Sequence, residues 1–372
     1  MGSPMAMSGA GGPARGVTRS DVARYAGVST AVVSYVVNNG PRPVAATTAA
    51  RVRDAIAVLG YQPNANARAL KLGTAGLLGL LVPDTGNPFF AEYALAIEQA
   101  ATQRGLALLI ANSGSDLGVE ATLLTDLANR QLDGLIVAGA GGPPVDSTLS
   151  GVTAVTPTVF VDTASPVPGY RTVGADKHAG ALQAAQHLVE VHGHDNVALL
   201  MGRGARHATD ERETGWRDAL RALDVERGEV AYATFTRHGG YVAGQHLLAL
   251  RPRPTAVFAS SDLLGMGLLR AAHEAGLSIP DDLAIVSFDG TNQAEYCWPP
   301  LTTIRQPIQE MAAAAVAAIF DQAAPAHQLF PVSLLARRSC GCSLPDSDLK
   351  PDRAGSNPAP PTRHPRKSRK RP

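Results

Sequence analysis

The sequence predicts an N-terminal helix-turn-helix headpiece of three helices, followed by an α/β domain of two doubly wound lobes. Residues 18–38 hold two short helical segments joined by a glycine turn, and a third helical segment follows them. From residue 76 onward, short apolar runs alternate with longer helical stretches, which is typical of parallel sheets covered by helices. About 270 residues show this alternation, too many for one ordinary sheet, so we expect two lobes.

The composition of the chain indicates a folded protein. Of its 372 residues, 45% are hydrophobic and 17% charged, which excludes a wholly disordered chain. We find no apolar run long enough for a membrane span and no apolar secretory signal near the N-terminus. Three cysteines do not make a disulfide framework, so a reducing cytoplasm is the expected compartment.

The net charge of +1 conceals two basic ends and an acidic middle. Residues 1–75 carry eight Lys and Arg against two Asp, and residues 350–372 carry eight against one. The middle carries 17 basic and 29 acidic residues. This asymmetry favours a polyanion as the partner of the N-terminal end, with ordinary compositional drift as the alternative.

The first helices of the headpiece have clear boundary signals. Thr18 is an N-cap with Asp21 as its acidic partner three residues later, and Gly27 ends the helix because glycine tolerates a left-handed backbone. Ser29 caps the second helix. The apolar residues that we expect on the inner faces are Val22, Ala23, Ala26, Val32, Val33, Val36 and Val37. A third helix over residues 47–59 should end at Gly60.

The outer face of the second helix carries small and polar side chains, which lets it enter a DNA major groove. Thr30, Ala31 and Tyr35 can reach base edges. Arg19, Arg42 and Arg51 can contact phosphates, which adds salt-dependent affinity without sequence information. The alternative is a small three-helix core without a partner.

Residues 63–75 form the predicted hinge. Pro63 suits the start of a helix, but the helical stretch after it is too short to be stable alone in water, so it should become ordered only against a partner. The residues that we expect to contact DNA, with those of the hinge implied by the family resemblance given below, are Thr18, Arg19, Ser29, Thr30, Ala31, Ser34, Tyr35, Asn38, Arg42, Asn64, Ala67, Arg68, Leu70 and Lys71.

The body shows a regular alternation of buried strands and helices. The predicted strands lie at residues 76–83, 106–113, 133–139, 158–162, 196–202, 255–260 and 283–289. The predicted helices lie at residues 90–104, 119–130, 179–192, 214–223, 240–250, 263–275 and 308–323.

Polar and aromatic residues follow several predicted strands, and ligands of such folds bind at the carboxyl ends of strands. Carboxylates and an arginine beside an aromatic wall suit a hydroxyl-rich molecule such as a sugar or nucleoside. Taken singly, each Asp could instead cap a helix, and the phenylalanines could belong to a core. The strand-end residues are Asp84, Thr85, Asn87, Phe89, Phe90, Asp162, Thr163, Arg212, Asp262 and Asp289.

The stretch DVARYAGVSTAVVSYVVN, the third helix and GYQPNANARALK together resemble the headpiece of the lactose-repressor (LacI/GalR) family. The resemblance implies that Thr30, Ala31 and Tyr35 read an operator. It also implies that the hinge segments of two chains pair in the minor groove, where Leu70 enters between base steps. Leu70 as a plain hydrophobic contact is the alternative.

The body resembles the effector domain of the same family, which is related to periplasmic sugar-binding proteins. NPFF, QLDGLIV, TAVFASSDLLGMGLLRAAHEAGLSIPDDLAIVSFDG and LTTIRQP carry the likeness, and it spans roughly residues 17–338. Lys177, Ser261 and Gly265 depart from the family pattern, which bears on ligand preference. The effector residues expected from strand ends and resemblance together are Asp84, Asn87, Phe89, Phe90, Asp162, Arg212, Phe235, Asp262 and Asp289.

The resemblance also implies domain boundaries. Residues 1–16 and 343–372 should be disordered, residues 17–62 form the headpiece, and residues 76–342 form the effector domain. We expect lobe 1 at about 76–174 with 305–324, and lobe 2 at about 175–304 with 325–342.

Motifs for catalysis and metals are lacking in the sequence. We find no GxGxxG after a strand, no GxxxxGK[ST], no HExxH and no GxSxG. Cys340 and Cys342 have no ligand residues near them in the sequence, and His192 and His194 flank a turn glycine, so we expect no metal site, no cofactor and no catalytic residue.

These observations lead to the expectation of a cytoplasmic, homodimeric transcriptional regulator, a repressor, that binds operator DNA and responds to a small sugar or nucleoside effector. A solute-binding protein without DNA activity is the main alternative. An α/β enzyme fused to a DNA-binding domain is the other.

Overall fold

The computed structural model describes two compact units, residues 1–76 and residues 77–372, which we call the headpiece and the body. The described residues are 17–38, 40, 42–62, 74–139, 156–163, 165–204 and 210–343. The expected disordered ends, apart from residue 343, and the hinge residues 63–73 lie outside them.

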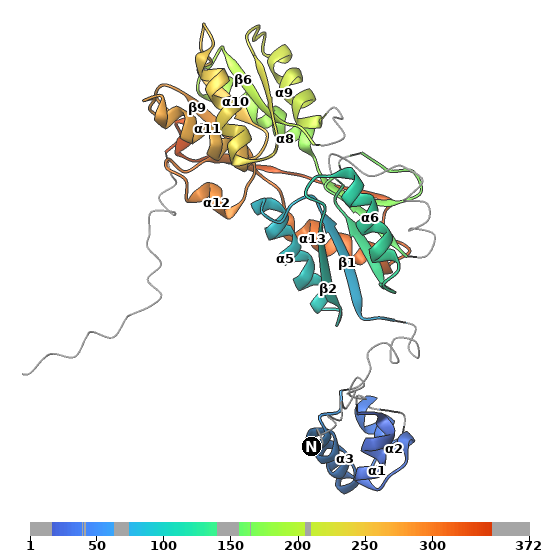
Figure 1. The fold of residues 1–372 in the computed structure, drawn as a ribbon. Coiled ribbons are helices and arrows are strands. Elements are labelled where there is room, and N and C mark those ends of the chain that lie inside the picture. Colours follow the sequence, from blue (N-terminus) through green and yellow to red (C-terminus); the bar gives the residue numbers. More distant parts are fainter. Residues whose placement is uncertain are drawn as a thin grey trace, which may run out of the picture. The chain divides into compact units, whose positions relative to one another are not determined.

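The headpiece consists of α1 (Arg19–Ala26), α2 (Thr30–Asn38) and α3 (Ala46–Leu59) (Figure 1). The predicted capping box is confirmed: the Asp21 amide donates to Thr18 Oγ1 at 3.4 Å, and the Thr18 amide donates to Asp21 Oδ2 at 2.9 Å. The two glycines that end α1 and α3, Gly27 and Gly60, both have φ of 63°, as predicted. The buried core residues of this unit are Val22, Ala23, Ala26, Val33, Val52, Ala55 and Tyr61.

Lobe 1 of the body has a six-stranded parallel sheet in the order β11-β5-β4-β3-β1-β2. The interior strands β1 and β3 are fully apolar because helices cover both faces of the sheet. α5 and α13 pack against one face, and the core beside α6 fills the other. The elements are β1 (Leu77–Val82), α5 (Pro88–Thr102), β2 (Ala107–Asn112), α6 (Leu117–Ala128), β3 (Gly134–Val137), β4 (Thr158–Val161), β5 (Arg171–Ala175), α13 (Ile308–Phe320) and β11 (His327–Phe330).

Lobe 2 has a second six-stranded sheet in the order β12-β10-β9-β8-β6-β7, parallel except for the β10–β12 pair. α8 and α9 pack on one face, and α10 and α11 on the other. The elements are α8 (Lys177–Gln186), the π-helical turn η1 (His187–Val191), β6 (Val197–Gly202), α9 (Glu211–Ala222), β7 (Val230–Ala233), α10 (Arg237–Ala249), β8 (Ala256–Ala259), α11 (Asp262–Glu274), β9 (Ala284–Asp289), α12 (Asn292–Glu295), β10 (Thr302–Arg305), β12 (Ser333–Leu335) and the 3₁₀ turn η2 (Arg338–Cys340).

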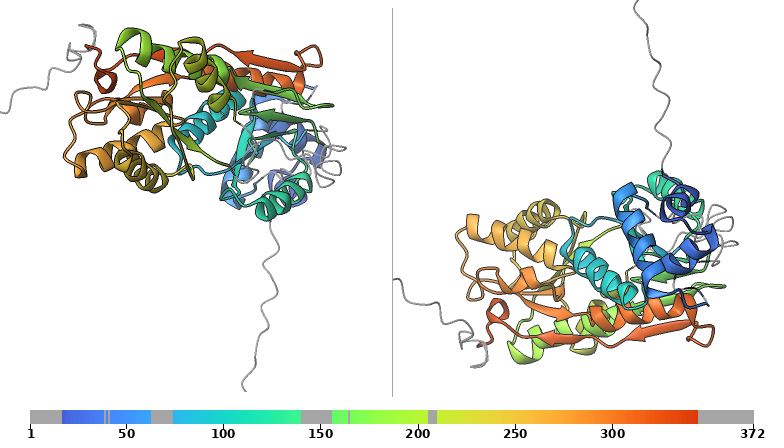
Figure 2. Two further views of the ribbon diagram at one scale, coloured as in Figure 1. Left: turned by 90° about the horizontal axis from the view of Figure 1, so that it is seen from above. Right: turned by 90° about the horizontal axis from the view of Figure 1, so that it is seen from below.

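The chain passes between the lobes three times. It crosses between β5 and α8, between β10 and α13, and between β11 and β12. Both views of Figure 2 show the orange-to-red C-terminal segment running through both lobes. The expected assignment of residues 325–342 to lobe 2 therefore needs correction, because β11 pairs with β5 in the sheet of lobe 1.

Five strands were not predicted from the sequence: β5, β7, β10, β11 and β12. They are short, and most mix polar with apolar residues, as in RTVGA of β5 and HQLF of β11. β5, β10, β11 and β12 lack the continuous apolar run by which buried strands are recognised, whereas VAYA of β7 is an apolar run of four residues that was overlooked.

Candidate functional site

The N-terminal half of α2 presents its side chains to solvent. Ser29, Thr30 and Ala31 are exposed, as expected for residues that meet base edges. Tyr35 is only half-buried rather than fully outward, because the chain turns back after α2: the Gly40 amide donates to the Tyr35 carbonyl at 3.0 Å. A Cβ atom on Gly40 would lie 2.5 Å from the Tyr35 ring, so the glycine makes room for it.

Basic residues of the headpiece precede and follow α2 along the chain, and their side chains are exposed. Arg19, Arg42 and Arg51 all lie at the surface, where they can contact phosphates. Ser34 is half-buried. The side chain of Asn38 and the hinge residues Asn64, Ala67, Arg68, Leu70 and Lys71 lie outside the description of the structure.

In the body, charged residues gather where the strands of the two lobes end. We call Asp162, Lys177, Asp210, Arg212 and Asp289 the interlobe polar cluster. Asp162 follows β4 of lobe 1, Lys177 begins α8 of lobe 2, and Asp289 ends β9 of lobe 2. All five lie at or near the carboxyl ends of strands, where ligands of parallel α/β sheets bind.

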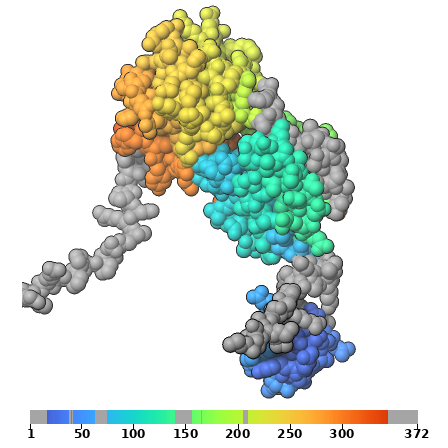
Figure 3. Space-filling view, in the orientation of Figure 1, coloured from blue at the N-terminus to red at the C-terminus, as the bar shows by residue number. Residues whose placement is uncertain are grey.

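Asp162 and Lys177 join the two lobes. Lys177 Nζ lies 2.7 Å from Asp162 Oδ1 and donates to the Asp162 carbonyl oxygen at 2.9 Å. Asp162 has φ of 58°, a left-handed conformation that is uncommon outside glycine and that turns the chain sharply after β4. A second bond between the lobes runs from the Asn292 amide of α12 to Glu92 Oε1 of α5, at 2.9 Å. Figure 3 shows the cyan α5 segment of lobe 1 against orange parts of lobe 2.

Asp210 and Arg212 form a two-point ion pair at the start of α9. Arg212 Nε donates to Asp210 Oδ1 at 2.8 Å, and Nη2 donates to Oδ2 at 2.7 Å. Arg212 Nη1 donates to the Ser260 carbonyl at 2.7 Å. Burial alone would raise the pKa of Asp210, but the Arg212 guanidinium holds that pKa far below its usual range. Both groups are therefore charged at neutral pH.

Asp289 is the most deeply buried carboxylate of the cluster, and it has few hydrogen-bond partners. It is 4% exposed, has φ of 116°, and accepts a hydrogen bond from Gln306 Nε2 at 3.0 Å. Burial raises its pKa well above the usual range, with a further increase from Asp262, and Arg212 and Lys177 oppose this. Such a carboxyl group can gain or lose a proton when a bound ligand changes its surroundings.

Two buried polar atoms near the cluster have no hydrogen-bond partner among the described residues. They are the Tyr93 hydroxyl, on α5 of lobe 1, and Gln306 Oε1, just after β10. Burial raises the pKa of Tyr93, and the charge of Asp162 raises it further, so its hydroxyl stays protonated. Buried polar atoms without partners are costly, and a polar ligand would satisfy them.

An aromatic wall flanks Arg212. Its guanidinium carbon lies 5.3 Å from the centre of the Phe235 ring and 5.4 Å from that of Phe288. A Cβ on Gly202 would meet the Phe235 ring at 2.3 Å, so the glycine lets this ring lie over the end of β6.

Asp262 serves the protein itself in this structure. Its carboxylate accepts hydrogen bonds from the Ser287 and Thr303 hydroxyls, at 2.6 and 2.7 Å, and from the amide and hydroxyl of Thr291, at 2.7 and 2.8 Å. It thereby fastens α11 to β9 and β10. Burial nonetheless raises its pKa.

The residues after β1 also make structural contacts. Asp84 is exposed and accepts from the Gly86 amide at 2.7 Å, whereas Asn87 caps α5 by accepting from the Phe89 amide at 3.1 Å. Phe89 and Phe90 belong to the buried core of lobe 1, with their ring centres 5.1 Å apart. None of these contacts involves a member of the interlobe polar cluster, although the Phe89 ring centre lies 5.8 Å from that of Tyr93, so the place of these four residues in an effector site stays a prediction.

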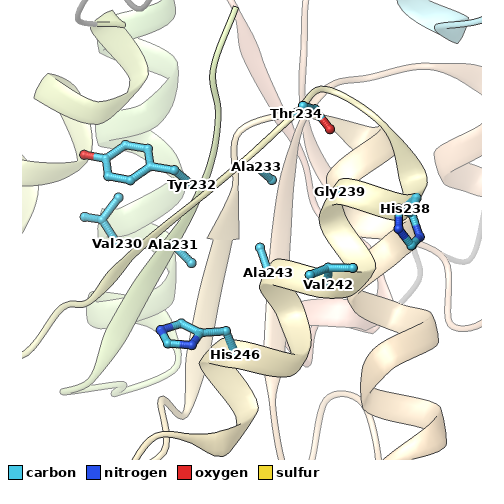
Figure 4. Close-up of a pocket in the computed structure, with 10 residues that line it drawn as sticks. All are labelled: Val230, Ala231, Tyr232, Ala233, Thr234, His238, Gly239, Val242, Ala243 and His246. Atoms are coloured by element: carbon cyan, nitrogen blue, oxygen red, sulfur yellow. The ribbon is translucent and has the colours of Figure 1, made fainter.

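A separate pocket of about 500 Å³ lies at the edge of lobe 2. Strand β7, the turn after it and α10 line it, with Tyr232, His238 and His246 among the lining side chains (Figure 4). The members of the interlobe polar cluster are not among its lining residues, so the pocket and the cluster are two separate features of the body.

Sequence reasoning missed Tyr93, Asp210 and Gln306 as site residues. Tyr93 lies within a helix rather than at a strand end, and Asp210 looks like an ordinary helix cap, which it also is. Gln306 stands in the LTTIRQP stretch, which was singled out in the sequence only for its likeness to the family.

The expectation that Cys340 and Cys342 have no ligand partners was wrong. His187 and His192 lie beside them in the fold, although about 150 residues separate them along the chain.

Comparison with known proteins assigns both units. Residues 18–64 match the family model "Bacterial regulatory proteins, lacI family", and residues 185–340 match "Periplasmic binding protein-like domain". These two domains in one chain define a DNA-binding regulator with a ligand-binding domain.

Relatives and solved structures agree. The chain is 35% identical over 308 residues to the HTH-type transcriptional repressor PurR of Pectobacterium carotovorum, covering 82% of this chain and 90% of the relative. It is similar to the lac repressor dimer bound to operator and the anti-inducer ONPF, with a TM-score of 0.76, 28% identity and coverage of 88% and 99% of the two chains. A structure of the transcriptional regulator CelR with cellobiose matches with a TM-score of 0.63, 30% identity and coverage of 87% and 99%.

The chain belongs to the LacI family and is a DNA-binding transcriptional regulator with an effector domain. Among the helices that the structure describes, none has the length and apolar character of a membrane-spanning helix.

Proposed function

We propose that this regulator is a homodimeric repressor that binds a near-palindromic operator. A small polar effector that enters between the lobes either lowers or raises its affinity for that operator. The observation that carries the effector part is the interlobe polar cluster, with two unpartnered polar atoms beside it. A repressor of this kind acts in the cytoplasm of a bacterium, where its operator lies.

The headpiece supplies the sequence readout in this proposal. Exposed Thr30 and Ala31 on α2 meet base edges, and Arg42 contacts a phosphate. Thr30→Ala should relax base preference at one operator position, whereas Arg42→Ala should weaken binding to all sequences and lower the salt dependence by about one counterion. The residue Leu70 of the hinge is the proposed wedge, and Leu70→Ala should abolish both operator binding and the bend in the DNA. Unchanged affinity and bend would remove this role.

Dimerisation is supported by apolar side chains exposed on lobe 1. Strand β2 lies at the edge of the lobe 1 sheet. Large apolar side chains on β2, on α5 and on α6 are exposed to solvent. Leaving such a surface in water is unfavourable, and a second copy would cover it. These residues are Leu95, Ile110, Leu117 and Val119.

The effector that matches the cluster has several hydroxyl or amide groups, as in a sugar or a nucleoside. Asp289 can accept a hydrogen bond from an effector hydroxyl. The Tyr93 hydroxyl and Gln306 Oε1 can form hydrogen bonds with the remaining polar groups of the effector. The aromatic wall of Phe235 and Phe288 offers an apolar surface to a ring. The CelR structure holds cellobiose, a molecule of this class.

The experiment for the DNA part is an in vitro selection of fragmented genomic DNA by the full-length protein at fixed salt concentration. Enrichment of one near-palindromic site establishes the regulator, and its neighbouring genes indicate the chemical class of the effector. Retention without any motif would favour the alternative, a solute-binding protein without regulatory activity. Steady turnover of candidate sugars would instead indicate an enzyme.

The experiment for the effector part uses Tyr93→Phe, which removes only the unpartnered hydroxyl. We expect a loss of about 0.5–1.5 kcal/mol of effector binding, or roughly 2- to 12-fold in affinity, with little change in stability. Tyr232→Phe, in the pocket at β7, is the matched control and should bind effector normally. Equal affinity of Tyr93→Phe and wild type would remove Tyr93 from the site.

A further inference from the structure

Two histidines and two cysteines meet in lobe 2, away from the interlobe polar cluster. His187 and His192 lie at the two ends of η1, the π-helical turn that continues α8, and Cys340 and Cys342 come from the last described residues of the chain. Ten helical residues, about 15 Å of α8, separate His187 from Lys177 of the cluster. The ligand atoms of all four side chains lie within 4.8 Å of one another.

The distances are those of a tetrahedral metal site. The two histidine Nε2 atoms are 3.2 Å apart, Cys340 Sγ is 3.3 Å from His187 Nε2, and Cys342 Sγ is 3.5 Å from each Nε2 atom. Around a zinc ion with Zn–N near 2.05 Å and Zn–S near 2.3 Å, tetrahedral geometry separates the ligand atoms by about 3.3–3.8 Å. These four separations are within or slightly below this range, and the remaining two pairs, from Cys340 Sγ to His192 Nε2 and to Cys342 Sγ, lie within 4.8 Å.

The backbone on both sides is arranged to bring these side chains together. Residues 187–191 form a π-helical turn, in which residues five apart lie on the same face, so His187 and His192 point the same way. An ordinary α-helix would place residues five apart on different faces. The predicted helix over residues 179–192 therefore exists but changes its winding where the histidines stand.

Gly341 plays the corresponding part between the cysteines. Its φ of 104° is a conformation that side chains rarely adopt, and a Cβ there would lie 3.3 Å from His192 Nδ1. Glycine thus lets the chain turn so that both cysteines face the same point while the His192 ring packs over the turn.

The surroundings of Cys340 also suit a metal ligand. The Thr302 hydroxyl lies 3.0 Å from Cys340 Sγ and can donate a hydrogen bond to the sulfur, the kind of outer contact that orients a metal ligand.

We propose that His187, His192, Cys340 and Cys342 bind one zinc ion in a closed, four-coordinate structural site. Two thiolates and two imidazoles form one of the ligand sets typical of structural zinc, which is four-coordinate and tetrahedral. The ion clasps the C-terminal end of the body to α8 and, through Cys340, to β10. Neither the DNA readout nor the effector site depends on this assignment.

The test measures metal in the full-length protein. The protein is purified with a thiol reductant, its free thiols are titrated, and it is reconstituted with zinc and, in parallel, with cobalt(II). We expect one zinc per chain after desalting of the zinc form. The cobalt form should show the visible bands of tetrahedral cobalt with two thiolate ligands, and these bands should disappear when zinc is added. A chelator should lower the melting temperature of the body, and zinc should restore it.

Variants locate the site. Loss of an outer contact to a metal ligand lowers metal affinity about 10- to 100-fold. Cys342→Ser and His192→Gln each remove a ligand itself, so each should lower zinc affinity by more than this. Cys297→Ser, at the cysteine outside the cluster, and His194→Gln, whose Nδ1 lies 3.0 Å from the Thr255 hydroxyl, should bind one zinc as wild type does. Both ligand positions are partly exposed, so these variants should fold.

The proposal is overturned if the reduced wild-type protein retains much less than one zinc per chain. It is also overturned if Cys342→Ser and His192→Gln retain as much zinc as the two controls. Cobalt bands without thiolate character would equally exclude the cysteines as ligands.

Discussion

Arg212 offers the sharpest test of how lobe 2 is held together at the effector site. Its side chain donates two hydrogen bonds to Asp210 and one to the Ser260 carbonyl, and it is almost completely buried. Arg212→Ala removes these bonds and leaves the Asp210 carboxylate without its cation. Breaking one side of a buried ion pair costs about 3–5 kcal/mol. Because the Asp210 side chain is still 23% exposed, we expect about 3 kcal/mol, the lower end of that range.

The assay is a double-mutant cycle by urea unfolding. Trp216, on the same helix as Arg212, is 2% exposed, so its fluorescence should report the unfolding of lobe 2. Trp298 is 86% exposed and should contribute a nearly constant signal. Arg212→Ala and Asp210→Ala should each destabilise the protein, and the double variant should lose clearly less than the sum of the two.

The expected coupling free energy is at the upper end of the range of about 0.5–3 kcal/mol seen for residues in direct contact. If the two losses add to within about 0.3 kcal/mol, the pair does not act as one unit and the reasoning fails. A small loss in Arg212→Ala alone would also contradict it, since the carboxylate would then be well solvated without its partner.

Three further predictions concern stability. Thr18→Ala removes one half of the capping box with Asp21 and should lower the stability of the headpiece by about 1 kcal/mol, seen as an earlier headpiece transition in thermal unfolding, and an unchanged transition would contradict it. Burial raises the pKa of Asp289 in the folded state, so the folded protein holds this proton more tightly than the unfolded chain. The unfolding free energy should then fall as pH rises from the usual aspartate pKa through the raised one, and Asp289→Asn should flatten that fall in urea titrations at several pH values, whereas parallel profiles would refute the assignment. Gly290→Ala should lower the melting temperature more than Gly105→Ala, because both have positive φ (74° and 73°) but only at Gly290 would a Cβ lie 2.5 Å from a backbone atom of β10, and equal losses would count against this steric reason.

The sequence was most informative where one residue type has one physical consequence. Glycines at positions 27 and 60 were predicted to end helices because glycine adopts a left-handed backbone conformation with little steric cost. Both glycines have that conformation. Strands buried on both faces, such as LLGLLV of β1, were recognised because no polar residue interrupts them. Strands that contain polar residues, such as RTVGA of β5 inside a sheet and HQLF of β11 at a sheet edge, were missed.

The site was harder to predict because its chemistry depends on which polar atoms remain without protein partners. Asp262 and Asn87 were expected to face the effector, but the fold uses them for its own hydrogen bonds. The Tyr93 hydroxyl lies within helix α5, away from the strand ends that the sequence pattern points to, and it has no hydrogen-bond partner in the described part of the chain. This outcome depends on distances between helices and strands far apart in sequence.

The same limit explains the missed cluster of histidines and cysteines. Cys340 and Cys342 were judged by their sequence neighbours, whereas their partners lie on α8. The π-helical turn that aligns the two histidines has no sequence signal that we can name.

The three passages of the chain between the lobes have a consequence for protein synthesis. Lobe 1 lacks α13, which fills one face of its sheet with Met311, Ala315 and Val316, until residue 320 has left the ribosome. Its last strand, β11, follows at residues 327–330, and lobe 2 receives β12 only at residues 333–335. The headpiece, complete by residue 62, can therefore fold early during translation, whereas neither lobe can close its core before the chain is nearly finished. A truncated product that stops before residue 308 would carry a DNA-binding headpiece on an unfinished body, and such a fragment is a natural substrate for chaperones and proteases.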